Sequence, residues 1–234
     1  MNRRPAAAQY SRGEWMSLTE PASNPNSQPI RIPKWVAVVG AGSGGPQALA
    51  QVLPQLPPEL AGVVVVVQQI RPGFTRVLVD ILQPACQLPI HEADDGQALL
   101  PSRIYVVPAN SSLTFENQGA DPSENYRLLL EPIADSRELA TTRIDAAMIS
   151  AARIFGNKCV GVLLTGLGTD GCEGMRSIRD AGGLTIAQDQ ASSVVHGLPA
   201  SAIEAGLVHE VLPLWSIADH IAGLKEGANN AVAV

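Results

Sequence analysis

The segment Trp35-Val-Ala-Val-Val-Gly-Ala-Gly-Ser-Gly-Gly-Pro46 joins an apolar run to a glycine-rich turn and to the start of a helix. Its five apolar residues 35–39 indicate a strand that is covered on both faces. The glycines permit a tight turn, and Pro46 suits the first turn of the following helix. Later segments repeat the order of strand, turn and helix. This alternation predicts an α/β fold with a doubly wound, mostly parallel sheet.

Hydrophobic periodicity places the other elements along the chain. The strands at 104–107, 113–116 and 126–130 follow one another without a helix, so this middle section is expected to be an antiparallel excursion. Thr141 or Thr142 is expected to cap the helix at 144–155, and Gly156 to end it. Further strands are predicted at residues 63–67, 160–164, 184–187 and 208–212, and further helices at 49–53, 74–82, 172–181, 199–205 and 216–224.

Composition bounds the class of protein. The chain has 234 residues, of which 46% are hydrophobic, and a formal net charge of −6. This apolar share excludes wholesale disorder, and the lack of a basic run argues against nucleic-acid binding. The apolar stretch 60–67 is too short to cross a bilayer, and the N-terminus lacks the hydrophobic region of a secretory signal. We therefore expect a cytoplasmic protein without membrane insertion, whose Cys86, Cys159 and Cys172 are buried, reduced thiols.

The chain is expected to hold one folded domain. Residues 1–32 are rich in Pro, Ser and Asn and are interpreted as a flexible arm, and residues 227–234 as a loose tail. The domain itself is placed at residues 33–226. Ligands of such folds bind beyond the carboxyl ends of the parallel strands, so the loops that follow Val39, Val67, Leu164 and Ala187 are expected to share one functional edge.

The first of these loops, Gly40-Ala41-Gly42-Ser43-Gly44-Gly45, permits three interpretations. It matches the GxGxxG dinucleotide fingerprint, but the next strand ends in Gln68-Gln69 instead of the acidic residue that would hold a ribose. This disfavours nicotinamide and flavin cofactors. The loop also resembles a nucleophile elbow with Ser43 at its centre, which would need a base and an acid. The third interpretation is a purely structural tight turn.

Candidate partners for Ser43 are few. Of the four histidines, His209 is predicted in a strand and His220 in the last helix, whereas His196 follows a strand at the functional edge and is the candidate base. A solvated loop histidine is the alternative. Asp170, in Leu164-Thr-Gly-Leu-Gly-Thr-Asp-Gly171, can present its carboxylate to a site or cap the helix that begins near Gly171.

Several motifs in this order resemble the catalytic domain of the chemotaxis protein-glutamate methylesterases, the CheB type. The resemblance extends from about Trp35 to Leu224. It implies hydrolysis of γ-glutamyl methyl esters on chemoreceptors by a Ser-His-Asp triad, in a protein that usually carries an N-terminal receiver domain. The motifs are Gln68-Gln-Ile-Arg-Pro-Gly-Phe-Thr75, Glu92-Ala-Asp-Asp-Gly96, Leu100-Pro101, Tyr105-Val-Val-Pro108, the Leu164–Gly171 segment, Thr185-Ile-Ala-Gln-Asp-Gln-Ala191 and Val194-Val-His-Gly-Leu-Pro199.

The resemblance also implies that two triad residues are missing. The family turn Gly-Ala-Ser-Thr-Gly-Gly places Gly42 at the nucleophile position, and its Gln-His pair places Gln69 at the base position. Asp170 matches the retained acid, and the backbone at Ser43 and Leu167 resembles the oxyanion-binding groups. Two flanking segments, residues 108–112 and 140–143, differ from the family pattern as well.

The sequence therefore predicts a catalytically degenerate CheB-type domain that binds a chemoreceptor or another chemosensory-array protein, with no cofactor and no metal. The alternative is an active methylesterase that uses Ser43, with His196 as base and Asp170 near it. The 32 residues before the predicted domain are too few for a receiver domain of about 100 residues, so none is expected in this chain.

Overall fold

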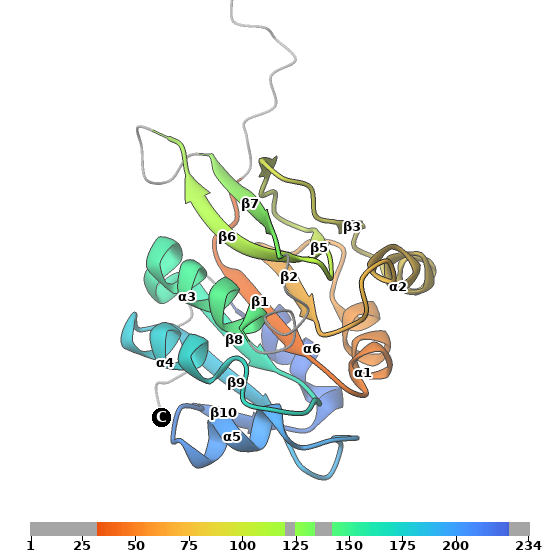
Figure 1. Ribbon diagram of the computed structural model, residues 1–234, viewed down its shortest axis with the longest axis vertical. Coiled ribbons are helices and arrows are strands. Elements are labelled where there is room, and N and C mark those ends of the chain that lie inside the picture. Colours follow the sequence, from red (N-terminus) through yellow and green to blue (C-terminus); the bar gives the residue numbers. More distant parts are fainter. Residues whose placement is uncertain (1–31, 120–124, 134–141, 225–234) are drawn as a thin grey trace, which may run out of the picture. The chain divides into compact units, whose positions relative to one another are not determined.

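The computed structural model describes residues 32–119, 125–133 and 142–224. A seven-stranded sheet lies at its centre, in the order β10-β9-β8-β1-β2-β5-β3, and each strand runs parallel to its neighbours (Figure 1). The predicted α/β fold with a mostly parallel sheet is confirmed. The strands are β1 (Val36–Ala41), β2 (Val63–Gln68), β3 (Ile90–Glu92), β5 (Ile104–Val106), β8 (Cys159–Leu163), β9 (Leu184–Gln188) and β10 (Glu210–Leu212).

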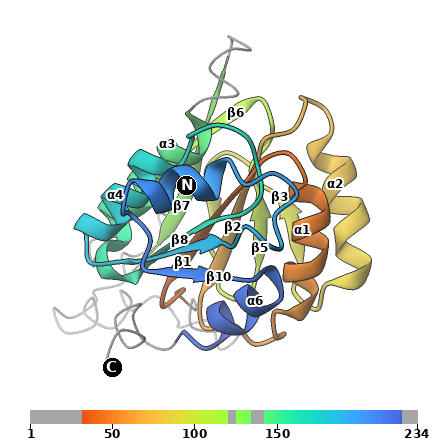
Figure 2. The same ribbon diagram turned by 90° about the horizontal axis from the view of Figure 1, so that it is seen from below.

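Helices cover both faces of this sheet, as Figure 2 shows. One face packs against α1 (Gly45–Val52), α2 (Thr75–Leu82) and α6 (Leu214–Ala222). The other packs against α3 (Arg143–Phe155), α4 (Cys172–Asp180) and α5 (Leu198–Glu204). Because both faces are covered, β1 and β2 are buried at every residue, as their uninterrupted apolar runs require.

A small antiparallel sheet lies over the α3 face, in the order β4-β7-β6. Its strands are β4 (Gln97–Ala98), β6 (Ser111–Asn117) and β7 (Tyr126–Pro132). The expected antiparallel excursion therefore exists, but its predicted extent was wrong. The strand near residue 104 is β5, which pairs in parallel with β2 and β3 and belongs to the main sheet. All three residues of β5 are buried, which suits an inner parallel strand, whereas β6 alternates between buried and half-buried.

The strand order reverses at β1, whose neighbours are β2 and β8. The strands that follow β1 first in the chain, β2, β3 and β5, lie on one side of it. The later strands β8, β9 and β10 lie on the other side. The loops after β1 and β8 therefore meet at the carboxyl edge, at the switch point where such sheets bind ligands. This agrees with the expected functional edge.

Several smaller expectations have clear outcomes. Cys159 is buried, but Cys86 and Cys172 are only half-buried, so the description of all three as buried thiols was wrong. Burial nevertheless raises the pKa of the Cys86 thiol to about 11. His209 lies one residue before β10 instead of within a strand. The predicted arm and tail fall outside the described residues, apart from Ile32. None of the described helices is long and apolar enough to span a bilayer.

The start of β1 gives a test of the core. Trp35 is fully buried, its indole N–H donates to the carbonyl of Leu224 (3.2 Å), and a Cβ on Gly62 would lie 2.1 Å from its ring. We expect Gly62→Ala to lower the free energy of unfolding by roughly 2–3 kcal/mol, because the ring has no room to move. Gly206→Ala, at φ +68° in open space, is the control and should cost only about 1 kcal/mol of backbone strain. Urea denaturation compares the two, and equal losses would contradict this packing.

Candidate functional site

Thr165 joins three loops by hydrogen bonds at the carboxyl edge of the sheet. Its backbone carbonyl accepts a hydrogen bond from the N–H of Gly42 (2.9 Å). Its buried hydroxyl, which has one proton to donate, lies within hydrogen-bond distance of the carbonyls of Ser43 (2.9 Å) and Val195 (3.1 Å), and it accepts the N–H of Val195 (2.9 Å). The loops after β1, β8 and β9 therefore form one unit. Sequence reasoning missed Thr165, although its place two residues after the end of β8 was a usable signal.

Gly42, Gln69 and Asp170 lie in a row within this unit. The Gln69 side-chain amide donates from Nε2 to Oδ2 of Asp170 (3.1 Å). Its Oε1 lies 2.9 Å from the point that a Cβ on Gly42 would occupy. The Cα of Gly166 lies equally close to that point, so any side chain at position 42 requires both the amide and this backbone to shift. The structure thus brings together the three positions that the resemblance associates with nucleophile, base and acid.

The side chain of Gln68 holds the glycine-rich turn after β1 by hydrogen bonds. It is buried and donates from Nε2 to the carbonyl of Gly42 (2.8 Å) and to that of Gln69 (3.0 Å). A Cβ on Gly45 would lie only 2.1 Å from its Oε1, so any other residue at the start of α1 would require the Gln68 side chain to shift. The end of β2 accordingly offers amide side chains whose Nε2 groups are already engaged, and no carboxylate for a ribose.

Asp170 caps a helix, but not the predicted one. Its carboxylate accepts the N–H groups of Ile144 (3.1 Å) and Asp145 (2.9 Å), in the first turn of α3. The prediction that Asp170 caps α4 was therefore wrong. Thr142 stands at the predicted N-cap position of α3, but its side chain makes no capping hydrogen bond, and Thr141 lies outside the described residues. Asp170 is 3% exposed, so its three hydrogen bonds compensate for the burial of the charge.

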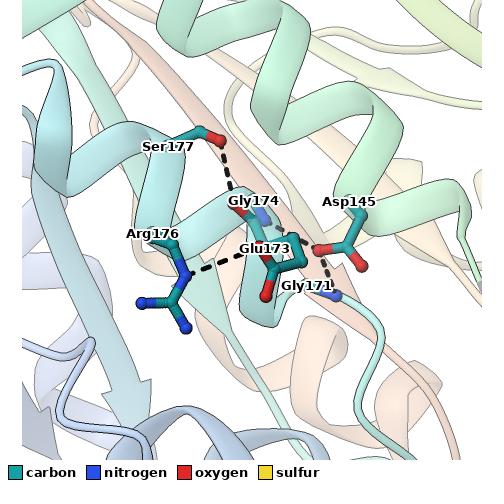
Figure 3. A network of polar contacts seen from close by, with 6 residues as sticks. All are labelled: Asp145, Gly171, Glu173, Gly174, Arg176 and Ser177. Atoms are coloured by element: carbon teal, nitrogen blue, oxygen red, sulfur yellow. Dashed lines mark hydrogen bonds and ion pairs between the residues drawn. The ribbon is translucent and has the colours of Figure 1, made fainter.

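The first turn of α4 is capped in return by Asp145. Oδ1 of Asp145 accepts the N–H groups of Gly171 (2.9 Å) and Gly174 (2.7 Å), as Figure 3 shows. Burial raises the pKa of the Asp145 carboxyl, and the hydrogen bond from Gly174 lowers it. A carboxylate from α3 therefore caps α4, and one from the loop directly before α4 caps α3, where in each case the helix dipole favours negative charge.

Arg143, the first residue of α3, ties this helix to the sheet. Its guanidinium is buried and donates to the carbonyls of Ser111 (2.9 Å), Gln68 (3.2 Å) and Pro108 (2.7 Å). Burial lowers its pKa to about 10, and the charge of Asp170 acts in the opposite direction. Arg143 thereby fixes the chain directly before Gln69. Sequence reasoning named it only as part of a divergent segment.

Ser43 and His196 lie at the same edge but are not joined. The Ser43 side chain is exposed, and Nδ1 of His196 lies 3.3 Å from the hydroxyl of Ser193. Within the described ranges, no hydrogen bond links His196 to Ser43 or to Asp170. His209 and His220 are engaged elsewhere, by Thr185 and Glu210.

Two backbone N–H groups remain available beside Gly42. Neither Ser43 nor Leu167 donates its amide to another described residue, and the Leu167 nitrogen lies 3.4 Å from the Cβ point of Gly42. The side chains next to them are apolar and exposed, Leu167 by 64% and Val194 by 72%. No three His, Cys, Asp or Glu side chains among the described residues are grouped to hold a metal ion.

Comparison with known proteins identifies the family. The model of the CheB methylesterase family matches residues 37–221. The chain belongs to the CheB methylesterase family. It is 41% identical over 187 residues to protein-glutamate methylesterase/protein-glutamine glutaminase 1 of Carboxydothermus hydrogenoformans, covering 80% of this chain and 54% of that protein. It is 42% identical over 182 residues to a protein of the same name, numbered 2, from Anaeromyxobacter dehalogenans, covering 78% and 51%.

A solved CheB structure has the same architecture. The crystal structure of the Thermotoga maritima CheB methylesterase catalytic domain superimposes with a TM-score of 0.75 at 31% sequence identity, and the match covers 82% of this chain and 98% of that one. The chain spans about half the length of the curated relatives that it matches.

The reciprocal caps give the test of this site. In Asp170→Asn an NH2 group replaces one carboxylate oxygen and faces buried N–H donors, so both Asp170→Asn and Asp170→Ala should lower the free energy of unfolding by about 2–3 kcal/mol. Asp180→Asn, at an exposed position in α4, is the control and should stay within about 0.5 kcal/mol of the wild type. Chemical denaturation measures all three. A wild-type stability for Asp170→Asn would show that one oxygen suffices and that the described hydrogen bonds are not all needed.

Proposed function

We propose that this chain is a catalytically degenerate CheB-type domain that binds a chemoreceptor or another chemosensory-array protein without hydrolysing its esters. One observation carries the proposal. Gly42, which offers no side chain, faces the amide of Gln69, and that amide is hydrogen-bonded to Asp170. We assign positions 42, 69 and 170 to the nucleophile, base and acid of the family.

This arrangement lacks the chemistry of ester hydrolysis by a triad. Glycine has no atom that can attack a carbonyl carbon, and a neutral amide cannot take a proton from a hydroxyl near pH 7. Loss of triad members in enzymes of this kind leaves about 10³–10⁴-fold acceleration over water, from the oxyanion groups and binding alone.

The features that remain support binding. The N–H groups of Ser43 and Leu167 can donate to an oxygen of a bound glutamyl or glutaminyl side chain. Leu167 and Val194 present apolar surface beside these donors, where a docked polypeptide would bury it. The proposed domain therefore keeps the groups that hold an acyl oxygen and lacks those that cleave the bond.

The alternative is an esterase in which Ser43 replaces the nucleophile. Ser43 would need His196, whose ring nitrogen lies near Ser193 instead. A displacement of a reacting atom by about 1 Å can already cost about 10²-fold in rate. The geometry therefore favours loss of catalysis over its relocation.

The hydrolysis of receptor esters separates these functions. We expect the purified chain to release no methanol from a methylated chemoreceptor fragment above background, because no activated nucleophile is present. The positive control is the Thermotoga maritima CheB catalytic domain under the same conditions. Turnover that is lost in Ser43→Ala would establish the alternative and overturn the proposal.

Binding is tested on the apolar surface beside the donors. Leu167→Asp should weaken binding to a chemoreceptor cytoplasmic fragment by roughly tenfold or more, since a buried leucine contributes about 1.5–3 kcal/mol. Val211→Asp is a matched control, because Val211 is also exposed (48%) but lies on the edge strand β10. Isothermal titration calorimetry compares the variants. If both bind as the wild type does, the partner does not dock at this edge.

A further inference from the structure

Helix α2 has an apolar stripe on its outward side. Its inward residues Thr75, Leu78, Val79 and Leu82 are buried in the core. On the outward side Phe74, just before the helix, is 51% exposed, Val77 49% and Ile81 67%. Their spacing of three and four residues aligns them along one line of the helix. The described residues thus leave a contiguous apolar line open to solvent, which is typical of an interaction surface.

A charged pair runs beside this stripe. Arg76 and Asp80 form an ion pair of 3.1 Å with side chains that are 70% and 59% exposed. At 100° per residue, Arg76 and Asp80 lie about 60–100° around the helix axis from Val77, on the side away from Phe74 and Ile81. The outward side of α2 thus has an apolar flank, formed by Phe74 and Ile81, and a charged flank, formed by Arg76 and Asp80. The arginine is near the N-terminus and the aspartate is nearer the C-terminus, the reverse of what the helix dipole favours. The pair therefore stabilises α2 itself less than the opposite order of charges would.

We propose that this surface binds a second copy of the chain, with the two α2 helices packed antiparallel about a two-fold axis. A two-fold rotation about an axis perpendicular to the helices reverses the direction of the second helix. It places the apolar flank against the partner's apolar flank and the charged flank against the partner's charged flank. Phe74 then meets Ile81 of the second copy, Val77 lies near the axis, and Arg76 faces Asp80 of the second copy. In a parallel arrangement the apolar flank would meet the charged one. The apolar flank meets the apolar flank, and opposite charges meet, only when the helices are antiparallel.

The size of the stripe sets the strength of this contact. An eight-residue helix is about 12 Å long, whereas a stable interface buries about 800 Å² on each partner. We therefore expect a weak dimer in rapid exchange with the monomer. The inference concerns α2 and is independent of whether the site near Gly42 binds or hydrolyses anything.

Sedimentation velocity over a range from about 10 μM to 1 mM tests the self-association. The wild type should shift from monomer towards dimer as its concentration rises, and Ile81→Lys should remain monomeric. Ile149→Lys is the matched control, because Ile149 is exposed (43%) on α3, and it should dimerise as the wild type does. Circular dichroism confirms that all variants are folded.

A charge exchange tests the antiparallel pairing itself. Arg76→Glu makes this flank acidic and Asp80→Arg makes it basic, so each variant alone should associate at least tenfold more weakly than the wild type. An equimolar mixture of the two should form a heterodimer. A wild type that is monomeric at every concentration overturns the proposal, as does a dimer that survives Ile81→Lys or a mixture that associates no better than its components.

Discussion

The exchange of carboxylates between α3 and α4 is the interaction on which the site depends. Asp170 precedes α4 but binds the first N–H groups of α3, and Asp145 lies in α3 but binds those of α4. The two helices are held so closely that a Cβ on Gly174 would lie 2.4 Å from Met148. Once α3 is fixed, Arg143 at its start fixes the carbonyl of Gln68 and with it the position of Gln69. The row formed by Gly42, Gln69 and Asp170 follows from these contacts.

Under the proposed function, this constraint explains why Asp170 is retained in a site that has lost its catalytic chemistry. Asp170 stabilises two N–H groups of α3 that would otherwise be buried without partners, and it does so whatever stands at positions 42 and 69. Its presence is therefore no sign of activity. In the proposed function the scaffold keeps the geometry of the family. The base that would transfer the proton is replaced by the amide of Gln69, and the nucleophile that would attack is replaced by Gly42, which has only a hydrogen atom as its side chain.

Much of the fold could be predicted because its signals are local. The apolar run 63–67, the stripe 74–82 and the glycine turn after residue 39 each determine their own element, and α/β topology follows from their alternation. The antiparallel excursion was predicted too wide, because the run at 104–106 is equally consistent with either kind of sheet. Asp170 was a candidate from its own loop, but the roles of positions 42, 69 and 170 came from the resemblance. The partners of Asp170, Arg143 and Thr165 lie 23 or more residues away in sequence, so no local pattern could reveal them.

Labelling with a serine-directed fluorophosphonate tests the central claim, the absence of an activated nucleophile, without any knowledge of the natural partner. Such probes react with a serine whose hydroxyl is deprotonated by a neighbouring base. Intact-mass spectrometry should show the wild-type chain unmodified under conditions that label an active CheB catalytic domain fully. A one-to-one adduct that peptide mapping places on Ser43, and that is lost in Ser43→Ala, would contradict the account.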